Sequence, residues 1–302
     1  MIIDFHQTNS FLKQKLLDNE SFYALRIDNT AGYVIECLLK GENPDPGFYT
    51  EKSIIEAGVV PTTKEYTLNS LYPMTIECMK RSDLLGFVDV ANTLHTKKDF
   101  LNHFSGRPIF AGLPMLVMDP AALVNISGYY ECTDPWTKYL KGKKVLVVST
   151  HAESILYQWD NMNKVWGDKK DLIVPFDLVD VIRSPYHPSM DNRQYPNCKN
   201  WEETVEYIKH KMESYDFDVL LAGSTTSAPF YAEHAKNIGK VGIQTGGTIQ
   251  LFFGILGYRW TQVEGYKNWH KMYNEHWINP LPIDEAKFRK DNLRLETNFA
   301  YW

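Results

Sequence analysis

Short apolar runs recur along the chain, and most of them end at a turn of small or polar residues. The clearest are residues 143–148 (Lys-Lys-Val-Leu-Val-Val) and 217–222 (Phe-Asp-Val-Leu-Leu-Ala). Runs of this length and branching are typical of buried strands. The same pattern predicts further strands at residues 22–27, 84–88, 176–181 and 240–244.

Segments with helical spacing lie between these strands. Pro229 suits the first turn of a helix that should end near Ile238, because Gly239 is a typical residue just beyond a helix. The order strand, turn, helix, strand predicts a parallel sheet with right-handed crossovers. The expected fold is therefore α/β: a Rossmann-like, mostly parallel sheet with flanking helices. Further helices are expected at residues 11–20, 31–40, 67–80, 152–166, 201–214, 249–257 and 262–277.

Two turns of small residues, 223–227 (Gly-Ser-Thr-Thr-Ser) and 245–248 (Thr-Gly-Gly-Thr), follow predicted strands. Open α/β sheets bind ligands at this position, and N–H groups and hydroxyls without a carboxylate suit phosphate oxygens. Neither turn has the spacing of a known phosphate-binding motif, and tight turn geometry alone also requires small residues. The candidate nucleotide-binding residues are Gly223, Ser224, Thr225, Thr245, Gly246, Gly247, Thr248, Gln250 and Arg259.

The predicted strand at 22–27 leads into a turn that carries Arg26, Asp28 and Asn29. Asp28 and Asn29 suit the N-cap of the next helix, which is the commoner role for such residues. Arg26 is different, because an arginine within an apolar strand needs an acidic partner or a ligand.

His151 and Glu153 follow the strand at 143–148 and could form an acid/base pair. Thr150-x-x-Glu153 also matches a capping box, and a histidine at a turn is often simply packed. A carboxylate here repels phosphate, so this turn should contact hydroxyls, a proton or a metal instead.

Composition disfavours nucleic-acid binding, a disulfide framework and a membrane span. The 302 residues are 44% hydrophobic and 23% charged, with a net charge of −5 and no polybasic run, which disfavours nucleic acid as a partner. Four cysteines without a C-x-x-C pair indicate free thiols in a reducing compartment. We find no targeting signal and no apolar run near the roughly 20 residues of a membrane span. We therefore expect a cytoplasmic protein.

The length fits one α/β domain, residues 1–302, in which residues 261–302 form a C-terminal helical extension. A long polar segment at 184–199 suits a lid or binding loop. The sequence does not predict an oligomeric state.

Several motifs resemble those of a known family. They are Pro-Trp-x4-Leu-Lys-Gly-Lys-Lys-Val-Leu-Val-Val at 135–148, His-Ala-Glu-Ser-Ile at 151–155, and Gly-Gly-Thr-Ile-Gln-Leu-x-Phe-Gly-Ile-x-Gly-x-Arg-Trp at 246–260. Over nearly its whole length the chain resembles uncharacterised bacterial and viral proteins placed beside the GT-D-type glycosyltransferases. The resemblance implies transfer of a sugar from a nucleoside diphosphate sugar, a UDP-sugar above all, to a hydroxyl of a glycan acceptor.

The resemblance also implies roles for particular residues. Glu153, or His151 in its place, would be the catalytic base; Arg26 and Arg259 would offset the charge of the diphosphate, and Asn29 would lie beside the sugar. Relatives carry Arg-x-Gly-x-x-Glu with a divalent metal, whereas residues 26–31 here read Arg-Ile-Asp-Asn-Thr-Ala. Asp28 would then orient the sugar or hold Mn²⁺ or Mg²⁺ weakly, and only together with the nucleotide.

Two alternatives stay open. The missing glutamate at Ala31 favours a protein of the same fold that binds nucleotide or glycan without turnover. Another sugar-modifying transferase, such as a pyruvyl or phosphoryl enzyme, would share the phosphate-binding turns.

Overall fold

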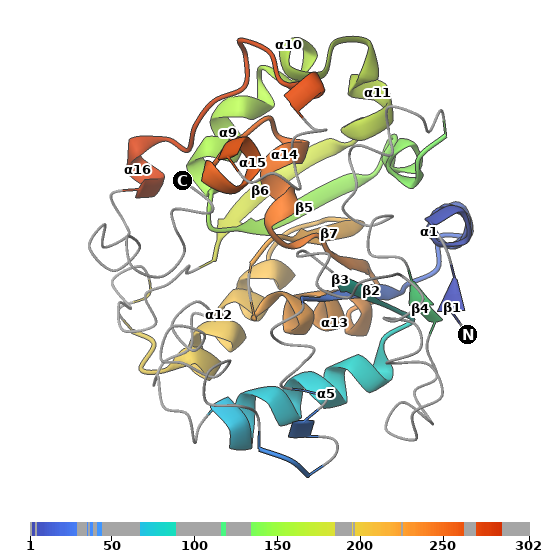
Figure 1. The fold of residues 1–302 in the computed structure, drawn as a ribbon, viewed down its shortest axis with the longest axis vertical. Helices are drawn as coiled ribbons and strands as arrows, with labels where there is room; N and C mark the ends of the chain where they lie inside the picture. The colour runs from blue at the N-terminus through green and yellow to red at the C-terminus, as the bar shows by residue number, and fades with distance from the viewer. Residues whose placement is uncertain are drawn as a thin grey trace.

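Eight parallel strands form one continuous sheet in the computed structural model (Figure 1). The structure describes residues 2–3, 5–28, 35, 37–38, 41–43, 67–88, 116–118, 134–184, 195, 197–224, 226–262 and 270–285. The strand order is β1-β4-β3-β2-β8-β7-β5-β6. The strands are β1 (Ile2–Ile3), β2 (Tyr23–Asp28), β3 (Leu84–Val88), β4 (Leu116–Met118), β5 (Lys144–Ser149), β6 (Asp177–Arg183), β7 (Val219–Ala222) and β8 (Val241–Gln244).

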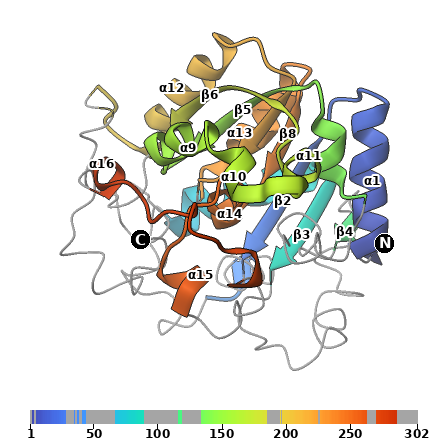
Figure 2. The same cartoon turned by 90° about the horizontal axis from the view of Figure 1, so that it is seen from above.

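Helices cover both faces of this sheet, so the fold has three layers (Figures 1 and 2). One face packs against α1 (Phe5–Leu17), η3 (Trp136–Leu140), α9 (Ala152–Trp159), α10 (Met162–Trp166), α11 (Lys170–Ile173), α14 (Ile249–Phe252) and α15 (Tyr258–Gln262). The other packs against η1 (Thr67–Leu71), α5 (Tyr72–Arg81), α12 (Trp201–Glu213) and α13 (Ala228–Asn237). Short elements complete the described chain: η4 (Gly167–Lys169), η5 (Gly246–Thr248) and α16 (Pro282–Glu285).

The connections that follow β5 and β7 leave the sheet on opposite faces. After β5 the chain enters α9, which packs in one core cluster, and after β7 it enters α13, which packs in the other. Because β5 and β7 are neighbours, the connections that leave their carboxyl ends diverge there, and this position is a topological switch point. Ligands of open α/β sheets bind at such points, so this edge of the sheet is where a site is expected.

A glycine sets the close packing of α13 on β8. A methyl group added to Gly242 would lie 2.1 Å from the carbonyl oxygen of Ala232, which is backbone and cannot move aside. The helix itself begins with Pro229 in its first turn and is followed by Gly239 at a φ of +77°. The predicted end of this helix near Ile238 is confirmed, since Ile238 is its C-cap.

The predicted α/β class and parallel sheet are confirmed, and six of the eight strands lie where the apolar runs place them. The two-residue β1 and the three-residue β4 were not predicted. The helix expected through Trp166 is two helices, because the chain turns at residues 160–161. The helix expected at 249–257 is one short turn, α14, followed by an irregular segment in which Ile255 bridges to Ile278.

The expected C-terminal helical extension is wrong where the chain is described. Residues 273–281 are not helical, and only a short 3-10 turn at 270–272 and the four-residue α16 flank them. Aromatic packing and non-helical hydrogen bonds hold this segment. Trp277 packs edge-on against Trp166 at 5.2 Å between ring centroids, and the N–H of Ile278 donates to the carbonyl of Gly254 at 3.0 Å. Most of the predicted lid at 184–199 and of the helix at 31–40 lies outside the described residues.

Candidate functional site

Two groups of polar residues lie at the carboxyl edge of the sheet. We call Arg26, Ser224 and Gly246, at the ends of β2, β7 and β8, the small-residue edge. We call Glu153, Arg183 and Asp284, beside the ends of β5 and β6, the charged edge. The sequence predicted the first group and only Glu153 of the second.

Arg26 and the glycine turn are in direct contact at the small-residue edge. The main-chain N–H of Arg26 donates to Oε1 of Gln244 at 3.0 Å, which ties β2 to the end of β8. A methyl group added to Gly246 would lie 2.1 Å from Nη1 of Arg26, and Gly246 has a φ of +60°. The positive φ favours glycine at this position, and the guanidinium of Arg26 occupies the space beside it that a side chain would enter.

Ser224 contributes a hydroxyl to the same edge. Its side chain is 1% exposed, and its Oγ has no hydrogen-bond partner among the described residues. A buried hydroxyl left in this state costs free energy, so such a group is often satisfied by a ligand or an ordered water.

Other predicted nucleotide-binding residues are engaged within the protein. The hydroxyl and the N–H of Thr245 both donate to the carbonyl of Ala222, and the hydroxyl of Thr248 donates to the carbonyl of Thr245. The N–H of Gly223 donates to the carbonyl of Val148 at 2.8 Å. A methyl group on Gly223 would meet Ile249, so this glycine serves close packing of α14 against the turn. Gly247 is half-buried in η5.

Arg183, at the end of β6, is the centre of the charged edge. Its Nη1 donates to the carbonyl of Thr150 at 2.9 Å, and its Nη2 donates to Oδ1 of Asp284 at 2.6 Å. The same nitrogen forms an ion pair with Glu153. The Arg183 side chain is 11% exposed, that of Asp284 is 0% exposed and that of Glu153 is 34% exposed. One guanidinium thus joins a fully buried carboxylate to one that reaches solvent.

Asp284 also anchors the C-terminal segment to the start of α9. Its Oδ2 accepts a hydrogen bond from the N–H of Ser154 at 2.8 Å and another from the Ser154 hydroxyl. That hydroxyl accepts in turn from the N–H of Leu281 at 2.9 Å. Residues 281–284 are therefore bonded to the first turn of the helix that carries Glu153.

The capping box predicted from Thr150 and Glu153 does not form. The N-cap of α9 is His151, which makes no side-chain cap, and the hydroxyl of Thr150 lies 3.0 Å from Nδ1 of His151 instead. Glu153 pairs with Arg183 on the neighbouring strand because that guanidinium offers the stronger, charge-assisted partner.

His151 is 2% exposed and belongs to a buried chain of hydrogen bonds. The indole N–H of Trp260 donates to Oε1 of Gln250 at 2.9 Å, and Nε2 of Gln250 lies 3.3 Å from Nε2 of His151. Because an indole nitrogen only donates, it fixes the amide with its NH₂ group toward the imidazole. In this orientation the amide NH₂ group faces Nε2 of His151.

Tyr195 approaches the charged edge from the opposite side. Its phenol donates to the main-chain carbonyl of Arg183. Burial raises the pKa of Tyr195 well above its ordinary value, so the phenol stays a neutral donor throughout the physiological range.

Some predicted site residues lie outside what the structure describes. These are Asn29, Thr225 and Ala31, together with the side chains of Asp28 and Arg259. The backbone of Asp28 ends β2, in register with Val88 of β3. Among the described residues, no group of three or more His, Cys, Asp or Glu side chains could hold a metal ion. The described side chains alone therefore do not make a metal centre, and the role of Asp28 stays a prediction.

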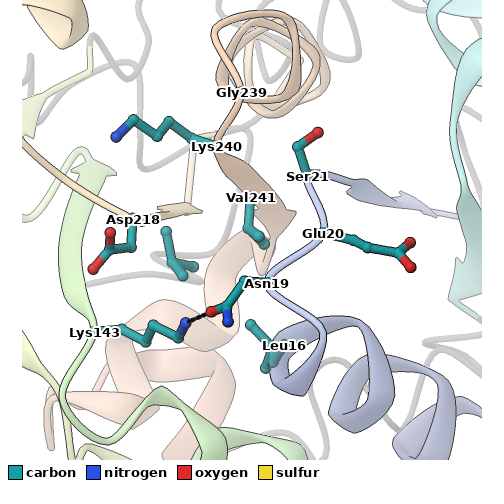
Figure 3. Close-up of a pocket in the computed structure, with 10 residues that line it drawn as sticks. Leu16, Asn19, Glu20, Ser21, Lys143, Asp218, Gly239, Lys240 and Val241 are labelled. Carbon is teal, nitrogen blue, oxygen red and sulfur yellow. Dashed lines mark hydrogen bonds between the residues drawn. The ribbon is translucent and has the colours of Figure 1, made fainter.

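A small polar pocket lies at the opposite, amino edge of the sheet (Figure 3). Its volume is about 120 Å³, well below the roughly 300–1,000 Å³ of typical ligand pockets. In Figure 3 the side chain of Lys143 points toward Asn19, to which it is hydrogen-bonded, while Glu20 and Lys240 point apart. Its size and position both exclude this pocket as the place for a nucleotide sugar.

Comparisons with known proteins identify no family for the chain. No protein-family model and no curated protein matches the chain. One similar solved structure is that of a new glycosyltransferase, of domain of unknown function 1792, from Streptococcus sanguinis. It has 12% identity over 95% of this chain and 97% of that chain, with a TM-score of 0.45. A selenomethionine-substituted domain of unknown function 1792 has 10% identity over 95% and 94% of the two chains, with a TM-score of 0.47. At these low values neither similarity carries a conclusion about activity.

Two expectations from composition have structural counterparts. Cys37, Cys78 and Cys198 are buried and form no disulfide with another described residue, while Cys132 lies outside the described residues. In the described parts of the chain, no helix combines the length and the apolar character needed to cross a bilayer.

Proposed function

We propose that the protein is a glycosyltransferase that moves a sugar from a nucleoside diphosphate sugar, most simply a UDP-sugar, to a hydroxyl of a glycan acceptor. The observation that carries the proposal is the contact of the Arg26 guanidinium with the Gly246 turn, at an edge that also holds the buried hydroxyl of Ser224. A planar cation beside a turn without carboxylates suits a diphosphate.

The width of the sheet supports an extended ligand. Neighbouring strands lie about 4.8 Å apart, so the three steps from β2 through β8 and β7 to β5 span roughly 14 Å. A nucleoside diphosphate sugar carries its phosphates between the nucleoside and the sugar. With the diphosphate at the small-residue edge, the sugar would extend toward β5 and Glu153.

Glu153 suits the acceptor side of the reaction. In the proposed step its carboxylate takes the proton of the acceptor hydroxyl while that oxygen bonds to the anomeric carbon. The bond from the anomeric carbon to the diphosphate breaks, and the electron pair leaves with the diphosphate, where Arg26 stabilises the charge. The side chain of Glu153 is 34% exposed, whereas that of Asp284 is fully buried, so Glu153 is the carboxylate of the charged edge that we assign to the acceptor.

His151 has a different role in this proposal. Both of its ring nitrogens lie at hydrogen-bonding distance from neighbouring side chains within the protein. We assign it to holding the turn between β5 and α9 against α14, and Glu153 to proton transfer. No step of the proposed mechanism passes through a metal ion.

The experiment that tests the proposal is thermal unfolding with UDP, uridine or free hexose, each with and without Mn²⁺. UDP at about 100 times its dissociation constant should add roughly 2.7 kcal/mol of stability. Uridine and hexose should add little, because neither carries the diphosphate. Equal shifts with UDP and uridine would contradict a diphosphate site at the Gly246 turn.

A second candidate is a protein that binds the nucleotide without turnover. The Glu153–Arg183 ion pair favours it, because a carboxylate held by a guanidinium is a weaker base. The two candidates differ in one measurement: the binding protein shows the UDP-dependent shift but releases no UDP from any UDP-sugar in the presence of glycan acceptors.

A further inference from the structure

The C-terminal segment places the buried carboxylate of Asp284 close to Glu153, the catalytic base of the proposed reaction. Asp284 is separated from Arg183 by 101 positions in sequence, yet its Oδ1 accepts from Nη2 of Arg183 at 2.6 Å. Its other oxygen is bonded to Ser154, one residue beyond Glu153. Neither Arg183 nor Asp284 belongs to a recognisable sequence motif.

The three charged groups share one positive charge between two negative charges. Asp284 is fully buried and cannot be stabilised by water, so its charge depends on Arg183 and on the donors of Ser154. Glu153 reaches solvent and shares the same guanidinium. Asp284 and Glu153 therefore compete for one guanidinium, which orients Glu153 while Asp284 offsets part of its positive charge.

We propose that Arg183 and Asp284 form a positioning pair that sets both the orientation and the proton affinity of Glu153. The C-terminal segment, through Asp284, then completes the reaction centre. This inference rests on the proposed function, in which Glu153 is the base.

Other described groups around Glu153 do not replace this pair. His151 precedes it in the turn, and its Nε2 lies 3.3 Å from Nε2 of Gln250. The phenol of Tyr195 donates to the main-chain carbonyl of Arg183. Among the described residues, Arg183 from β6 and Asp284 from α16 are charged side chains whose removal should move the titration of Glu153.

The first experiment needs no substrate. The carboxyl carbon of Glu153 is followed by ¹³C NMR against pH in the full chain labelled at glutamate, with its resonance assigned by its loss in Glu153→Gln. In Asp284→Asn the guanidinium acts on Glu153 alone, so the titration midpoint should fall by about one pH unit. In the double variant Arg183→Gln/Asp284→Asn the cation is gone, and the midpoint should rise above that of the unchanged protein.

These opposite shifts separate charge from general damage to the fold. Asp180→Asn is the matched control: Asp180 also lies on β6, where it accepts from the phenol of Tyr215 at 2.6 Å, away from Glu153. It should leave the midpoint unchanged. If Asp284→Asn alone fails to fold, the double variant, which leaves no unpaired buried charge, still tests the sign. A midpoint that does not move, or that moves the same way in both variants, overturns the proposal.

The second experiment is the pH profile of transfer from UDP-sugar. In Asp284→Asn the acidic limb of kcat should move down with the Glu153 midpoint, and the plateau should fall because a weaker base accepts the proton less readily. KM for the donor should not change. An unshifted limb in an active enzyme overturns the positioning role. If no transfer occurs but the NMR midpoints shift as expected, the pair is upheld and the proposed function fails instead.

Discussion

The small-residue edge and the charged edge lie on one side of the same sheet but are built in opposite ways. At the charged edge, Arg183, Asp284 and Ser154 are hydrogen-bonded to one another or to the main chain. At the small-residue edge, the hydroxyl of Ser224 has no partner among the described residues, and a guanidinium lies over a glycine turn. The first is organised before any ligand arrives, whereas the second offers groups that a ligand would complete.

This difference matches the two tasks of a transferase. A general base must be held in place before the reaction, because orientation lost at that moment lowers the rate. A binding turn gains affinity from buried polar groups that form their hydrogen bonds only with the ligand. Substitutions at the charged edge should therefore change rate and stability, and those at the small-residue edge should change affinity.

The largest effect is expected for Glu153→Gln. The amide keeps the shape of the side chain but accepts no proton, so the rate of transfer should fall by about 10²–10⁴-fold while UDP binding is retained. Product release measured at saturating donor, beside a UDP titration, checks both parts. Glu206→Gln on the exposed face of α12 is the control. Turnover near that of the control would remove Glu153 from the reaction.

Arg183→Met should chiefly reduce stability. It leaves Asp284 buried without its cation, and breaking a buried pair in this way costs about 3–5 kcal/mol. Replacing both residues, in Arg183→Met/Asp284→Leu, should recover most of the loss because no unpaired charge remains. Unfolding in urea measures the free energy for each. Equal stability of the single and double variants would show that Asp284 does not depend on Arg183.

Most of the fold follows from patterns that are local in sequence. The apolar runs at 84–88 and 143–148 lie within one residue of β3 and β5. Continuous runs of leucine and β-branched residues are typical of parallel strands that are buried on both faces. Helix lengths near residues 152–166 and 249–257 were overestimated, because tertiary contacts such as the Ile255–Ile278 bridge override helical spacing.

The site was predicted only where a local rule points to it. Arg26 is conspicuous because it interrupts an apolar strand, and Gly246 because it follows one. Arg183 lies two residues beyond the strand predicted at 176–181, so the same rule did not select it. Asp284 gives no such signal: its meaning comes from contact with Arg183 and Ser154, more than a hundred positions away in the chain.

At the small-residue edge, Arg26→Met should weaken UDP binding. A hydrogen bond to a charged group contributes about 1.5–3 kcal/mol, so the dissociation constant should rise roughly 10- to 150-fold. Calorimetric titration measures it. Arg81→Met is the matched control, because Arg81 is an exposed arginine that pairs with Glu233 on the opposite face of the sheet. A loss of affinity shared by both variants would mean that overall charge, and not the Gly246 turn, attracts the nucleotide.

The smallest effect, and the sharpest in sign, is expected for Ser224→Ala. Without ligand the variant should be as stable as the unchanged protein or slightly more so, because it removes a buried hydroxyl that has no described partner. With ligand it should lose one hydrogen bond, about 0.5–1.5 kcal/mol, or roughly 2- to 10-fold in the dissociation constant for UDP. Ser227→Ala, in the same turn, should behave in the opposite way. Its hydroxyl accepts from the indole N–H of Trp201 at 3.1 Å, so its loss should lower stability and leave affinity unchanged. Thermal unfolding without ligand and calorimetry with UDP measure both quantities for both serines. If the two variants lose stability alike and bind UDP alike, the Ser224 hydroxyl belongs to the fold, and the diphosphate must be sought elsewhere along the carboxyl edge.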